Sequence, residues 1–330
     1  PKYIMVYELI KVINGNSYLY LVHNVRLISG KSKKITKYLG VTENIEKSQI
    51  KKLIEENLIF FNKKELEIRL EQIKQLKIGY NFQFFEELEK LNSKFQLIFI
   101  EDSTKKSNQE ILFLKYFIHN SNAIEGSKIA FEEVVRLVDE KKSNHKNKNE
   151  VQEVINSLLA WKYLKEGFIF NETSLKKLYS ILTKKLLMEN GEKYPLGYKK
   201  KSNDVGFNEK TGLRNSTTPP EKVKGEINDL FKWYKESKKI YHPIELAFEF
   251  NMRYLIIHPF LDGNGRTGRL LMNKILIDYN YLPMIIFKSE SNEMNKVMNK
   301  YRDGHKVKYH TFMIENLKKT YREIYNKNLF

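Results

Sequence analysis

The chain has 330 residues, 41% of them hydrophobic, and a formal net charge of +18 at pH 7. This length and apolar content predict one large or two modest folded domains and exclude a disordered chain. Because the chain has no cysteine, disulfide bridges and thiolate metal sites are also excluded.

The N-terminal region alternates apolar and polar residues with the period of β-strands. Residues 3–40 read this way, with turn signals at residues 14–16 and 29–31. From Glu43 to about Lys77 the period becomes helical, and charges occur throughout. We therefore expect a three-stranded antiparallel meander followed by one long, charged helix.

Gly79 interrupts this pattern, so we place a domain boundary near residue 80. Residues 1–80 hold 15 basic and 8 acidic residues, which makes them a basic accessory domain. Such a domain could bind nucleic acid, with Tyr18, Tyr20 and Tyr38 interleaved among the cations. Aromatic residues on alternating strand positions more often belong to a core, and we favour that interpretation.

Helical periodicity dominates beyond residue 80, which predicts a mainly α domain over residues 81–330. The predicted helices span residues 82–98, 106–119, 129–140, 148–165, 173–188, 220–237, 243–257, 266–280, 290–303 and 308–326. Two interruptions stand out. The polar residues 141–150 indicate an exposed loop, and the glycine-punctuated residues 191–219 indicate a β-hairpin flap.

The stretch HPFLDGNGRTGR, residues 258–269, combines groups that suit transfer of a nucleotide. His258 ends an apolar helix and precedes Pro259, which places the imidazole at a turn as a candidate general base. Asp262 follows inside the loop, where a single carboxylate can hold Mg²⁺ together with phosphate oxygens and water.

The second half of this stretch supplies candidate phosphate ligands. Gly263, Asn264 and Gly265 can bring backbone N–H groups around an anion at a helix N-terminus. Arg266 and Arg269 lie three positions apart on the first turn of that helix, so we expect both guanidinium groups to face the same anion. Phe260 is expected to be a buried anchor of the loop rather than a chemical group.

Two other phosphate-binding motifs do not fit this stretch. Gly263, Gly265 and Gly268 match G-x-G-x-x-G, but a dinucleotide fingerprint follows a strand, whereas this stretch follows a helical pattern. An ATPase phosphate loop requires G-K-[ST], which does not follow. Both motifs are therefore rejected.

The stretch resembles the signature of the Fic family, H-x-F-x-[DE]-G-N-G-R-x-x-R. Its specified positions are filled by His258, Phe260, Asp262, Gly263, Asn264, Gly265, Arg266 and Arg269. The resemblance implies an all-helical Fic bundle that uses ATP and Mg²⁺ to transfer AMP to a Ser, Thr or Tyr hydroxyl of a protein. It implies His258 as base, Asp262 as metal ligand, and the glycines, Asn264 and the arginines as phosphate ligands.

Some alternatives stay open within this resemblance. The intact Gly263 and Gly265 favour AMP transfer over phosphoryl transfer, but the motif does not select the nucleotide base. A silent nucleotide-binding module would have lost a key residue, whereas His258, Asp262 and Arg266 are all present. The protein partner is unidentified, self-modification is included, and a homodimer is expected only as a family tendency.

A second motif lies upstream, where residues 121–126 read SNAIEG. It resembles the inhibitory motif [ST]-x-x-x-E-[GN] of the same family, on a helix expected over about residues 112–126. Glu125 would pair with Arg269 and occupy the guanidinium needed by a phosphate. Ser121 and Gly126 complete the motif, although Glu-Gly also suits a plain helix end. In some relatives this glutamate orients a water that removes AMP, so a de-AMPylating or bifunctional enzyme is the alternative.

The flap at residues 191–219 lies where this family carries a hairpin that aligns the target by strand addition. The family pattern has an arginine shortly after the glycine that here is Gly197, whereas Tyr198 and Lys199 follow it. We expect residues 199–201, three lysines, to be a solvated run.

No run of about 18 uncharged apolar residues occurs in the chain. The N-terminal residues also lack the layout of a secretory signal. We therefore expect a cytoplasmic protein without a membrane partner.

Overall fold

The computed structural model describes residues 5–27, 31–75, 82–101, 103–188, 190–208 and 212–326. The chain forms two compact units. The first comprises residues 1–108 together with the short segments 238–242 and 279–281, and the second comprises the rest. The boundary expected near residue 80 lies outside the described residues and stays a prediction.

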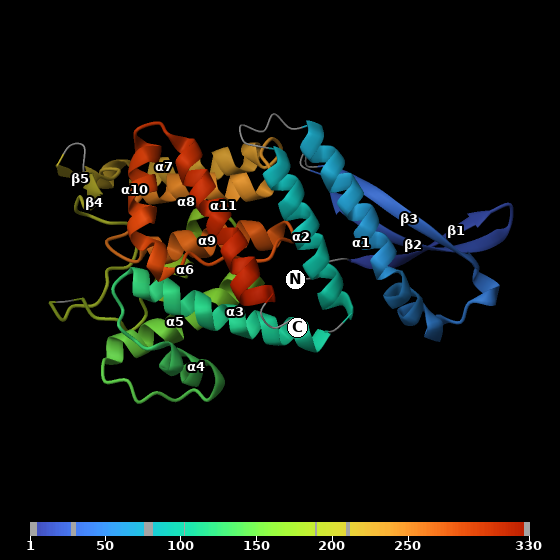
Figure 1. Ribbon diagram of the computed structural model, residues 1–330, viewed down its shortest axis with the longest axis horizontal. Coiled ribbons are helices and arrows are strands. Elements are labelled where there is room, and N and C mark those ends of the chain that lie inside the picture. Colours follow the sequence, from blue (N-terminus) through green and yellow to red (C-terminus); the bar gives the residue numbers. More distant parts are fainter. Residues whose placement is uncertain are drawn as a thin grey trace. The chain divides into compact units, whose positions relative to one another are not determined.

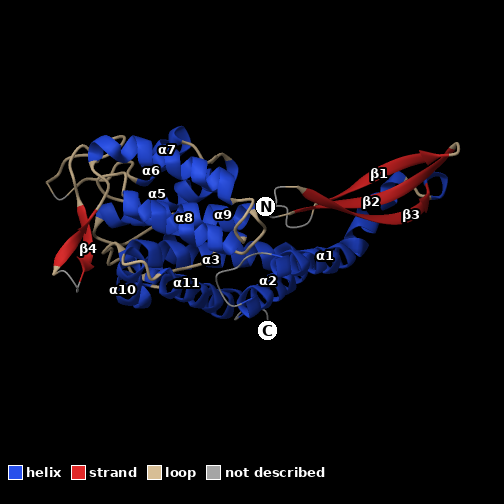
Figure 2. Cartoon of the chain, turned by 90° about the horizontal axis from the view of Figure 1, so that it is seen from above, coloured by secondary structure: helices blue, strands red, loops and turns tan. Residues whose placement is uncertain are grey.

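The first unit contains the expected three-stranded antiparallel meander, in the order β1-β2-β3 (Figures 1 and 2). The strands are β1 (Val6–Ile13), β2 (Asn16–Arg26) and β3 (Ser32–Val41). The turn expected at residues 29–31 lies largely outside the described residues. On one face of the sheet, Leu21, Val25 and Ile35 pack with Phe61 of helix α1 (Ile50–Gln75). This packing forms the apolar core of the unit.

The three tyrosines expected in this core lie on the opposite face of the sheet. Tyr20 pairs with Tyr38 across the strands, and the Tyr38 side chain is 52% exposed. The prediction that they are core residues is therefore wrong. Leucines at the neighbouring positions of β2 fill the core instead, because successive strand residues point to opposite faces.

Helix α1 also begins later than Glu43, at Ile50. Two 3-10 turns come first, η1 (Thr42–Asn44) and η2 (Lys47–Gln49). At the second turn, the side chains of Glu46 and Gln49 form a capping box with the backbone. This box satisfies N–H groups that have no intrahelical acceptor and so fixes where the helix starts.

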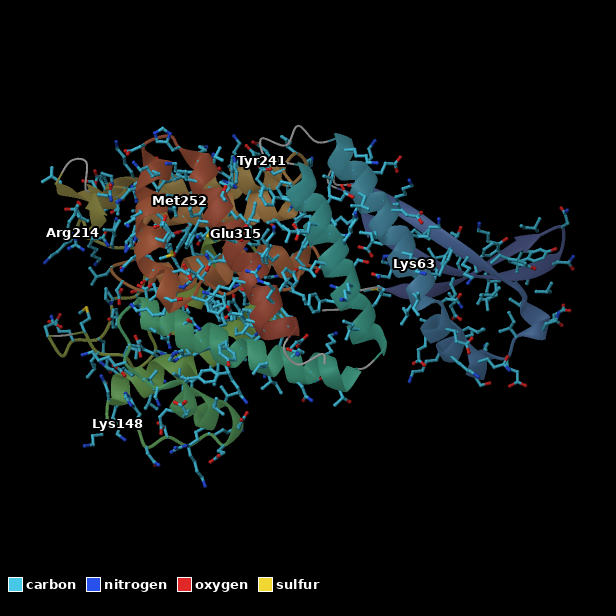
Figure 3. All side chains as sticks on the ribbon, in the orientation of Figure 1. Lys63, Lys148, Arg214, Tyr241, Met252 and Glu315 are labelled. Carbon is cyan, nitrogen blue, oxygen red and sulfur yellow. The ribbon has the colours of Figure 1, made fainter. Side chains whose placement is uncertain are left out.

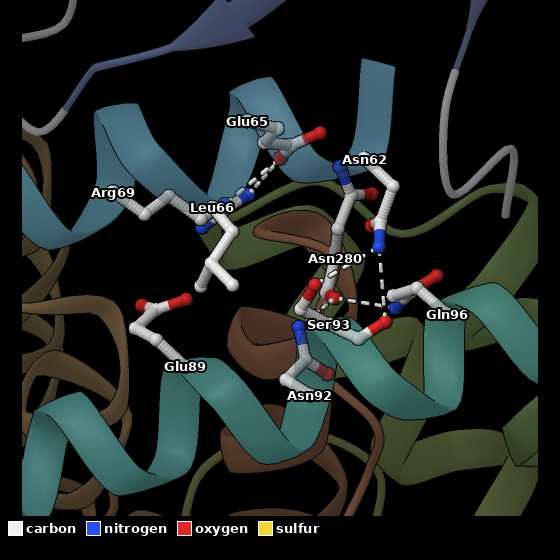
Figure 4. Close-up of a pocket in the computed structure, with 9 residues that line it drawn as sticks. All are labelled: Asn62, Glu65, Leu66, Arg69, Glu89, Asn92, Ser93, Gln96 and Asn280. Atoms are coloured by element: carbon white, nitrogen blue, oxygen red, sulfur yellow. Dashed lines mark hydrogen bonds and ion pairs between the residues drawn. The ribbon is translucent and has the colours of Figure 1, made fainter. Parts of the chain in front are cut away.

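Helix α2 (Phe82–Glu101) packs beside α1 through polar groups, shown in Figure 4. Asn62 donates to both oxygens of Ser93, and Asn92 and Gln96 donate to the carbonyl of Asn280. The cavity between these side chains has a volume of about 10 Å³. That is room for about one water molecule and not for a ligand.

The second unit is helical, as expected for a Fic-type bundle. Its helices are α3 (Ser103–Ile124, which begins in the first unit), α4 (Phe131–Asp139), α5 (Lys148–Glu166), α6 (Glu172–Leu182), α7 (Pro220–Ser237), α8 (Pro243–Ile257), α9 (Asn264–Asp278), η3 (Lys288–Glu290), α10 (Ser291–Arg302), α11 (Lys306–Thr320) and the π-helical turn η4 (Tyr321–Asn326). The helix expected over residues 82–98 is α2 of the first unit, and each of the other helices expected beyond residue 80 overlaps one of these.

Helices α8 and α9 form the centre of the second unit. Every residue from Pro243 to Met252 is buried, because α7, α9 and α11 all pack against α8. Helices α5 and α6 pack on α9. Helix α8 is mainly apolar, and its buried Glu249 is paired with Tyr301 and His310. The loop between α8 and α9 is therefore held by rigid elements at both ends.

The expected flap contains a short antiparallel hairpin, β4 (Asp204–Asn208) and β5 (Leu213–Ser216), seen at one edge of the bundle in Figure 1. The other described residues of the flap are irregular, apart from Lys193, which forms an isolated bridge with Leu187. The expected exposed loop at residues 141–150 separates α4 from α5 as far as residue 147, and its last three residues belong to α5. No described helix has the length and apolar character needed to cross a membrane.

Candidate active site

His258 lies directly after α8, at the point where Pro259 ends the helix. Its backbone has a φ of 51°, in the left-handed region that few residues other than glycine adopt. The N–H of His258 still donates to the carbonyl of Tyr254, so the chain leaves the helix within one residue. This sharp exit places the imidazole at the edge of a cavity rather than along the helix.

The surroundings of His258 keep its imidazole neutral. Burial lowers its pKa to about 4, and the ammonium of Lys199 acts in the same direction. The carboxylates of Glu125 and Asp262 oppose this shift but are outweighed. A histidine that is neutral at pH 7 can accept a proton, so the group suits a general base.

The loop after His258 is fixed by the Phe260 side chain, which is fully buried as expected. Its ring stacks on Tyr179 of α6, with centroids 3.8 Å apart. The Asn264 side chain accepts from the N–H of Phe260 at 3.0 Å and donates to its carbonyl at 2.8 Å. The polar atoms of the Asn264 side chain therefore shape the loop rather than face an anion.

The two glycines of the loop are required for different reasons. Gly263 has a φ of 73°, a conformation that strains any residue with a Cβ. Gly265 has no such φ, but a Cβ added to it would collide with the Oε1 atom of Glu125. Gly265 lies in the first turn of α9, where backbone N–H groups have no intrahelical acceptor. The Glu125 carboxylate therefore lies against the first turn of α9.

Arg269 is bound entirely by the end of α3. Its Nη2 donates to Oε1 of Glu125 at 2.7 Å and to the carbonyl of Ser121 at 2.8 Å. Its Nε donates to the Ser121 hydroxyl at 2.9 Å. Gly126, with a φ of 107°, ends the helix directly after Glu125. The upstream motif therefore ends a helix and also pairs with Arg269, while inhibition stays a prediction.

Arg266 faces different partners, so the two arginines do not converge on one group as expected. Its Nη1 donates to Oε1 of Glu153 on α5 at 2.6 Å, and its Nη2 lies 3.5 Å from Oδ2 of Asp262. The hydroxyl of Tyr194 also donates to Oδ2 of Asp262, at 3.0 Å. Burial raises the pKa of Glu153, and the cationic Arg266 opposes this shift. Glu153 and Tyr194 were not predicted from the sequence, because no motif spacing connects them to the loop.

Lys199 is buried rather than solvated, which corrects the expectation for the lysine run; Lys200 and Lys201 are exposed. The Lys199 ammonium donates to Oδ1 of Asn203 at 2.7 Å and to the Thr217 hydroxyl. These two residues flank the β4–β5 hairpin. Neutral oxygens can replace water around a buried ammonium, which explains why this lysine alone leaves the solvent.

The base of the flap is also tied to the catalytic loop through the backbone. The N–H of Lys199 donates to the carbonyl of Pro259 at 2.9 Å. The Asn203 amide donates to the carbonyls of Phe260 and Leu261 at 3.2 and 3.3 Å. The flap and the loop that carries the base therefore form one hydrogen-bonded structure.

Some of these groups line one cavity of about 510 Å³, a volume typical of a site for a small ligand. His258, Asp262 and Gly265 lie along it with Glu125 and Arg269. Arg214, labelled in Figure 3, lines it from β5. A base, a cationic clamp and a helix N-terminus on one cavity fit the triphosphate of a nucleotide.

The same cavity offers a limited place for a metal ion. Among the residues that the structure describes, no group of three or more His, Asp or Glu side chains is arranged to hold one. The Asp262 side chain is 47% exposed and lines the cavity as a single carboxylate. Mg²⁺ is commonly held by one or two carboxylates together with substrate phosphates and water, so the residues present fit this ion.

Comparison with known proteins agrees with this geometry. Residues 169–276 match the model of the Fic/DOC family. A protein adenylyltransferase Fic of Nematostella vectensis is 28% identical over 228 residues, covering 66% of this chain and 51% of the relative. A probable protein adenylyltransferase of Aquifex aeolicus is 28% identical over 161 residues, covering 47% of this chain and 45% of the relative. The chain thus spans about half the length of these curated relatives.

Solved structures share the fold. A Fic-domain-containing signalling protein from Bacteroides thetaiotaomicron aligns with a TM-score of 0.62 at 22% identity, covering 70% of this chain and 92% of its own. A Fic family protein from Desulfovibrio desulfuricans aligns with a TM-score of 0.63 at 21% identity, covering 77% of both chains. The matched residues 169–276 include the loop described above. The chain therefore contains a Fic domain of the Fic/DOC family.

Proposed function

We propose that this protein is a protein adenylyltransferase, which transfers AMP from ATP to a Ser, Thr or Tyr hydroxyl of a protein. The observation that carries the proposal is the cavity that a neutral His258 lines together with Arg269 and with Gly265 at the N-terminus of α9. A base and an anion site on one cavity suit attack of a hydroxyl on a bound phosphate. The names of the curated relatives support the same reaction.

The reaction that these residues would support is an in-line displacement. The target hydroxyl oxygen bonds to the α-phosphorus of ATP while His258 accepts the hydroxyl proton. The bond from the α-phosphorus to the bridging oxygen breaks, and pyrophosphate leaves. The products are an AMP–protein phosphodiester, pyrophosphate and one proton held by the imidazole.

The anion side of the cavity would hold the triphosphate. Backbone N–H groups at Gly265 would donate to phosphate oxygens at the positive end of α9. Arg269 would add charge-assisted hydrogen bonds to the same anion. Asp262 would hold Mg²⁺, which when bound neutralises negative charge on the phosphates. Arg266, which is bound to Glu153, would help to position Asp262 through its second guanidinium nitrogen.

The proposal includes inhibition by Glu125. Its carboxylate bonds to Arg269 and fills the space at Gly265, so it takes two of the interactions that a phosphate needs. Ser121 supports this arrangement by accepting from the same guanidinium. A triphosphate can bind in the productive position only when the Glu125 side chain moves. The site is therefore held inactive by its own chain.

A second candidate activity is the removal of AMP, because Glu125 and His258 line the same cavity. A carboxylate there could orient a water for attack on an AMP–protein bond, with His258 returning a proton to the leaving hydroxyl. This activity needs Glu125, whereas AMP transfer is opposed by it. The two functions therefore respond oppositely to Glu125→Gly.

The β4–β5 hairpin is proposed to align the target segment. Asp204, Val205 and Gly206 line the cavity beside His258. An extended target segment could add to this hairpin through backbone hydrogen bonds. The Lys199 contacts would then transmit the position of the target to the loop that carries the base.

The test is the intact mass of purified Glu125→Gly protein after incubation with Mg²⁺ and each of the four ribonucleoside triphosphates separately. We expect an adduct equal to AMP less one water with ATP, and no adduct in a Glu125→Gly/His258→Ala variant. Loss of AMP from the labelled protein on adding the unsubstituted chain, but not a Glu125→Gln variant, would establish the second activity. The absence of any adduct with all four nucleotides would refute the adenylyltransferase proposal.

A further inference from the structure

The sheet of the first unit has a second face that its helix does not cover. Helix α1 packs on the face that carries Leu21, Val25 and Ile35 (Figure 1). Strand pairing places the following residues on the other face, called here the open face: Tyr7, Leu9, Lys11, Tyr18, Tyr20, Val22, Asn24, Lys34, Thr36 and Tyr38. Of these only Val22, in the central strand, is buried. The open face is therefore accessible to solvent along most of its length.

Positive charge is concentrated in this sheet. Residues 5–41 hold six basic residues and one acidic residue, a net charge of +5. Residues 42–75, which contain α1, hold seven of each and are neutral. The single acid of the strands, Glu8, pairs with Leu21 and so points to the α1 side. The open face therefore carries cations and no carboxylate of the strands.

The lysines on the two sides of the sheet differ in their partners. On the α1 side, Lys33 lies 3.6 Å from a carboxylate oxygen of Glu71, and Lys37 lies over the ring of Phe60. On the open face, Lys11 lies over the ring of Tyr20, 4.6 Å from its centroid. Within the described part of the chain, neither Lys11 nor Lys34 pairs with a carboxylate. Both are exposed and can meet an external anion.

Aromatic rings lie between these cations. The ring of Tyr38 has its centroid 6.1 Å from that of Tyr18 and 5.3 Å from that of Tyr20. Tyr38 is 52% exposed, and Tyr7, on the opposite edge strand, is 38% exposed. Exposed rings interleaved with lysines on a sheet are the combination that stacks bases and neutralises phosphates.

We propose that the open face of β1–β3 binds single-stranded nucleic acid, with Lys11 and Lys34 on the phosphates and Tyr38 stacked on a base. Single strands are favoured over a duplex because stacking on a tyrosine ring needs a base that is free of its own stack. The positive charge of the open face favours an anionic partner and argues against a basic one. This activity is separate from AMP transfer, since it uses none of the residues of the Fic cavity.

The test is the binding of a fluorescent oligonucleotide of about 12 nucleotides by the full chain carrying His258→Ala, without ATP, across a series of salt concentrations. We expect Lys11→Gln/Lys34→Gln to lower the slope of log affinity against log salt by about 1.4, which corresponds to two phosphate contacts. The matched control is Lys51→Gln/Lys63→Gln, the same charge change on exposed positions of α1, where Figure 3 labels Lys63. The control should leave the slope unchanged.

The contribution of stacking is tested separately. Tyr38→Ser should weaken binding about ten-fold, whereas Tyr38→Phe, which keeps the ring, should bind within about two-fold of the parent. The proposal is overturned if a duplex of the same sequence binds as tightly as the single strand. It is also overturned if the α1 control lowers the slope as much as the open-face variant, which would assign binding to general positive charge.

Discussion

Replacing Glu125 by glycine should increase the rate of AMP transfer. The substitution removes a carboxylate that accepts from Arg269 at 2.7 Å, in a pair whose side chains are 5% and 27% exposed. A hydrogen bond between charged groups contributes about 1.5–3 kcal/mol. A competitor of that strength would reduce productive binding of the triphosphate roughly 10- to 100-fold. We therefore expect the initial rate at low ATP to rise by that factor.

The assay is incorporation of label from α-labelled ATP into the protein itself over a range of ATP concentrations. If Glu125 only competes with the nucleotide, the unsubstituted chain should approach the rate of the variant at saturating ATP, and the difference should lie in KM. If Glu125 also misplaces the phosphates, kcat should rise as well. Glu125→Gln separates charge from volume, because an amide still fills the space at Gly265. We expect the rates to increase in the order Glu, Gln, Gly.

The matched control is Glu140→Gly, since Glu140 follows helix α4 directly and is exposed, as a glutamate at a comparable helix end. It introduces the same flexibility without touching Arg269. A rate for Glu125→Gly within about two-fold of both the parent and this control would refute the competition between Glu125 and the triphosphate.

Three further predictions concern the same loop. Gly265→Ala should abolish AMP transfer even in the Glu125→Gly background, because the methyl group fills the phosphate position; label incorporation at saturating ATP tests this. Burial is the main cause that lowers the pKa of His258, and Lys199→Met removes the positive charge that adds to it, so the pKa should rise and the acidic fall in rate should move to higher pH. Phe260→Ala should lower the free energy of unfolding by about 3–5 kcal/mol, measured by urea denaturation.

The arrangement of the loop could be predicted from the sequence because its groups are adjacent in the chain. His258, Asp262 and Gly265 lie within eight positions, and the geometry of a helix end, a turn and a helix start places them together. The roles of Glu153 and Lys199 could not be predicted from the sequence, because each contacts the loop only through the packing of another element. No local period relates a residue of α5 to Arg266.

The sheet shows a different limit of sequence patterns. Strand β2 reads as tyrosine alternating with leucine, so both of its faces have apolar character. Alternation fixes which residues share a face, but it does not tell which face meets a helix. Only the position of Phe61 on α1 decides that Leu21 is in the core and Tyr20 outside. The alternation of tyrosine and leucine thus predicts the strands, but it does not predict which face of the sheet is buried.

The direction of two helices explains why the proposed inhibition can be reversed. Glu125 follows the C-terminus of α3, the end at which a helix dipole disfavours a carboxylate. It lies at the same time beside Gly265, in the first turn of α9, where the dipole favours an anion. Each effect amounts to about 0.3–1 kcal/mol, so the two roughly cancel and the pairing with Arg269 decides the position of the side chain. A triphosphate is not attached to the C-terminus of α3. It is therefore attracted by the N-terminus of α9 and by Arg269 without the same opposing effect of the α3 dipole. ATP therefore competes with a carboxylate that is held mainly by one ion pair. A shift of the end of α3 would move Glu125 away from Arg269 and free the site for ATP.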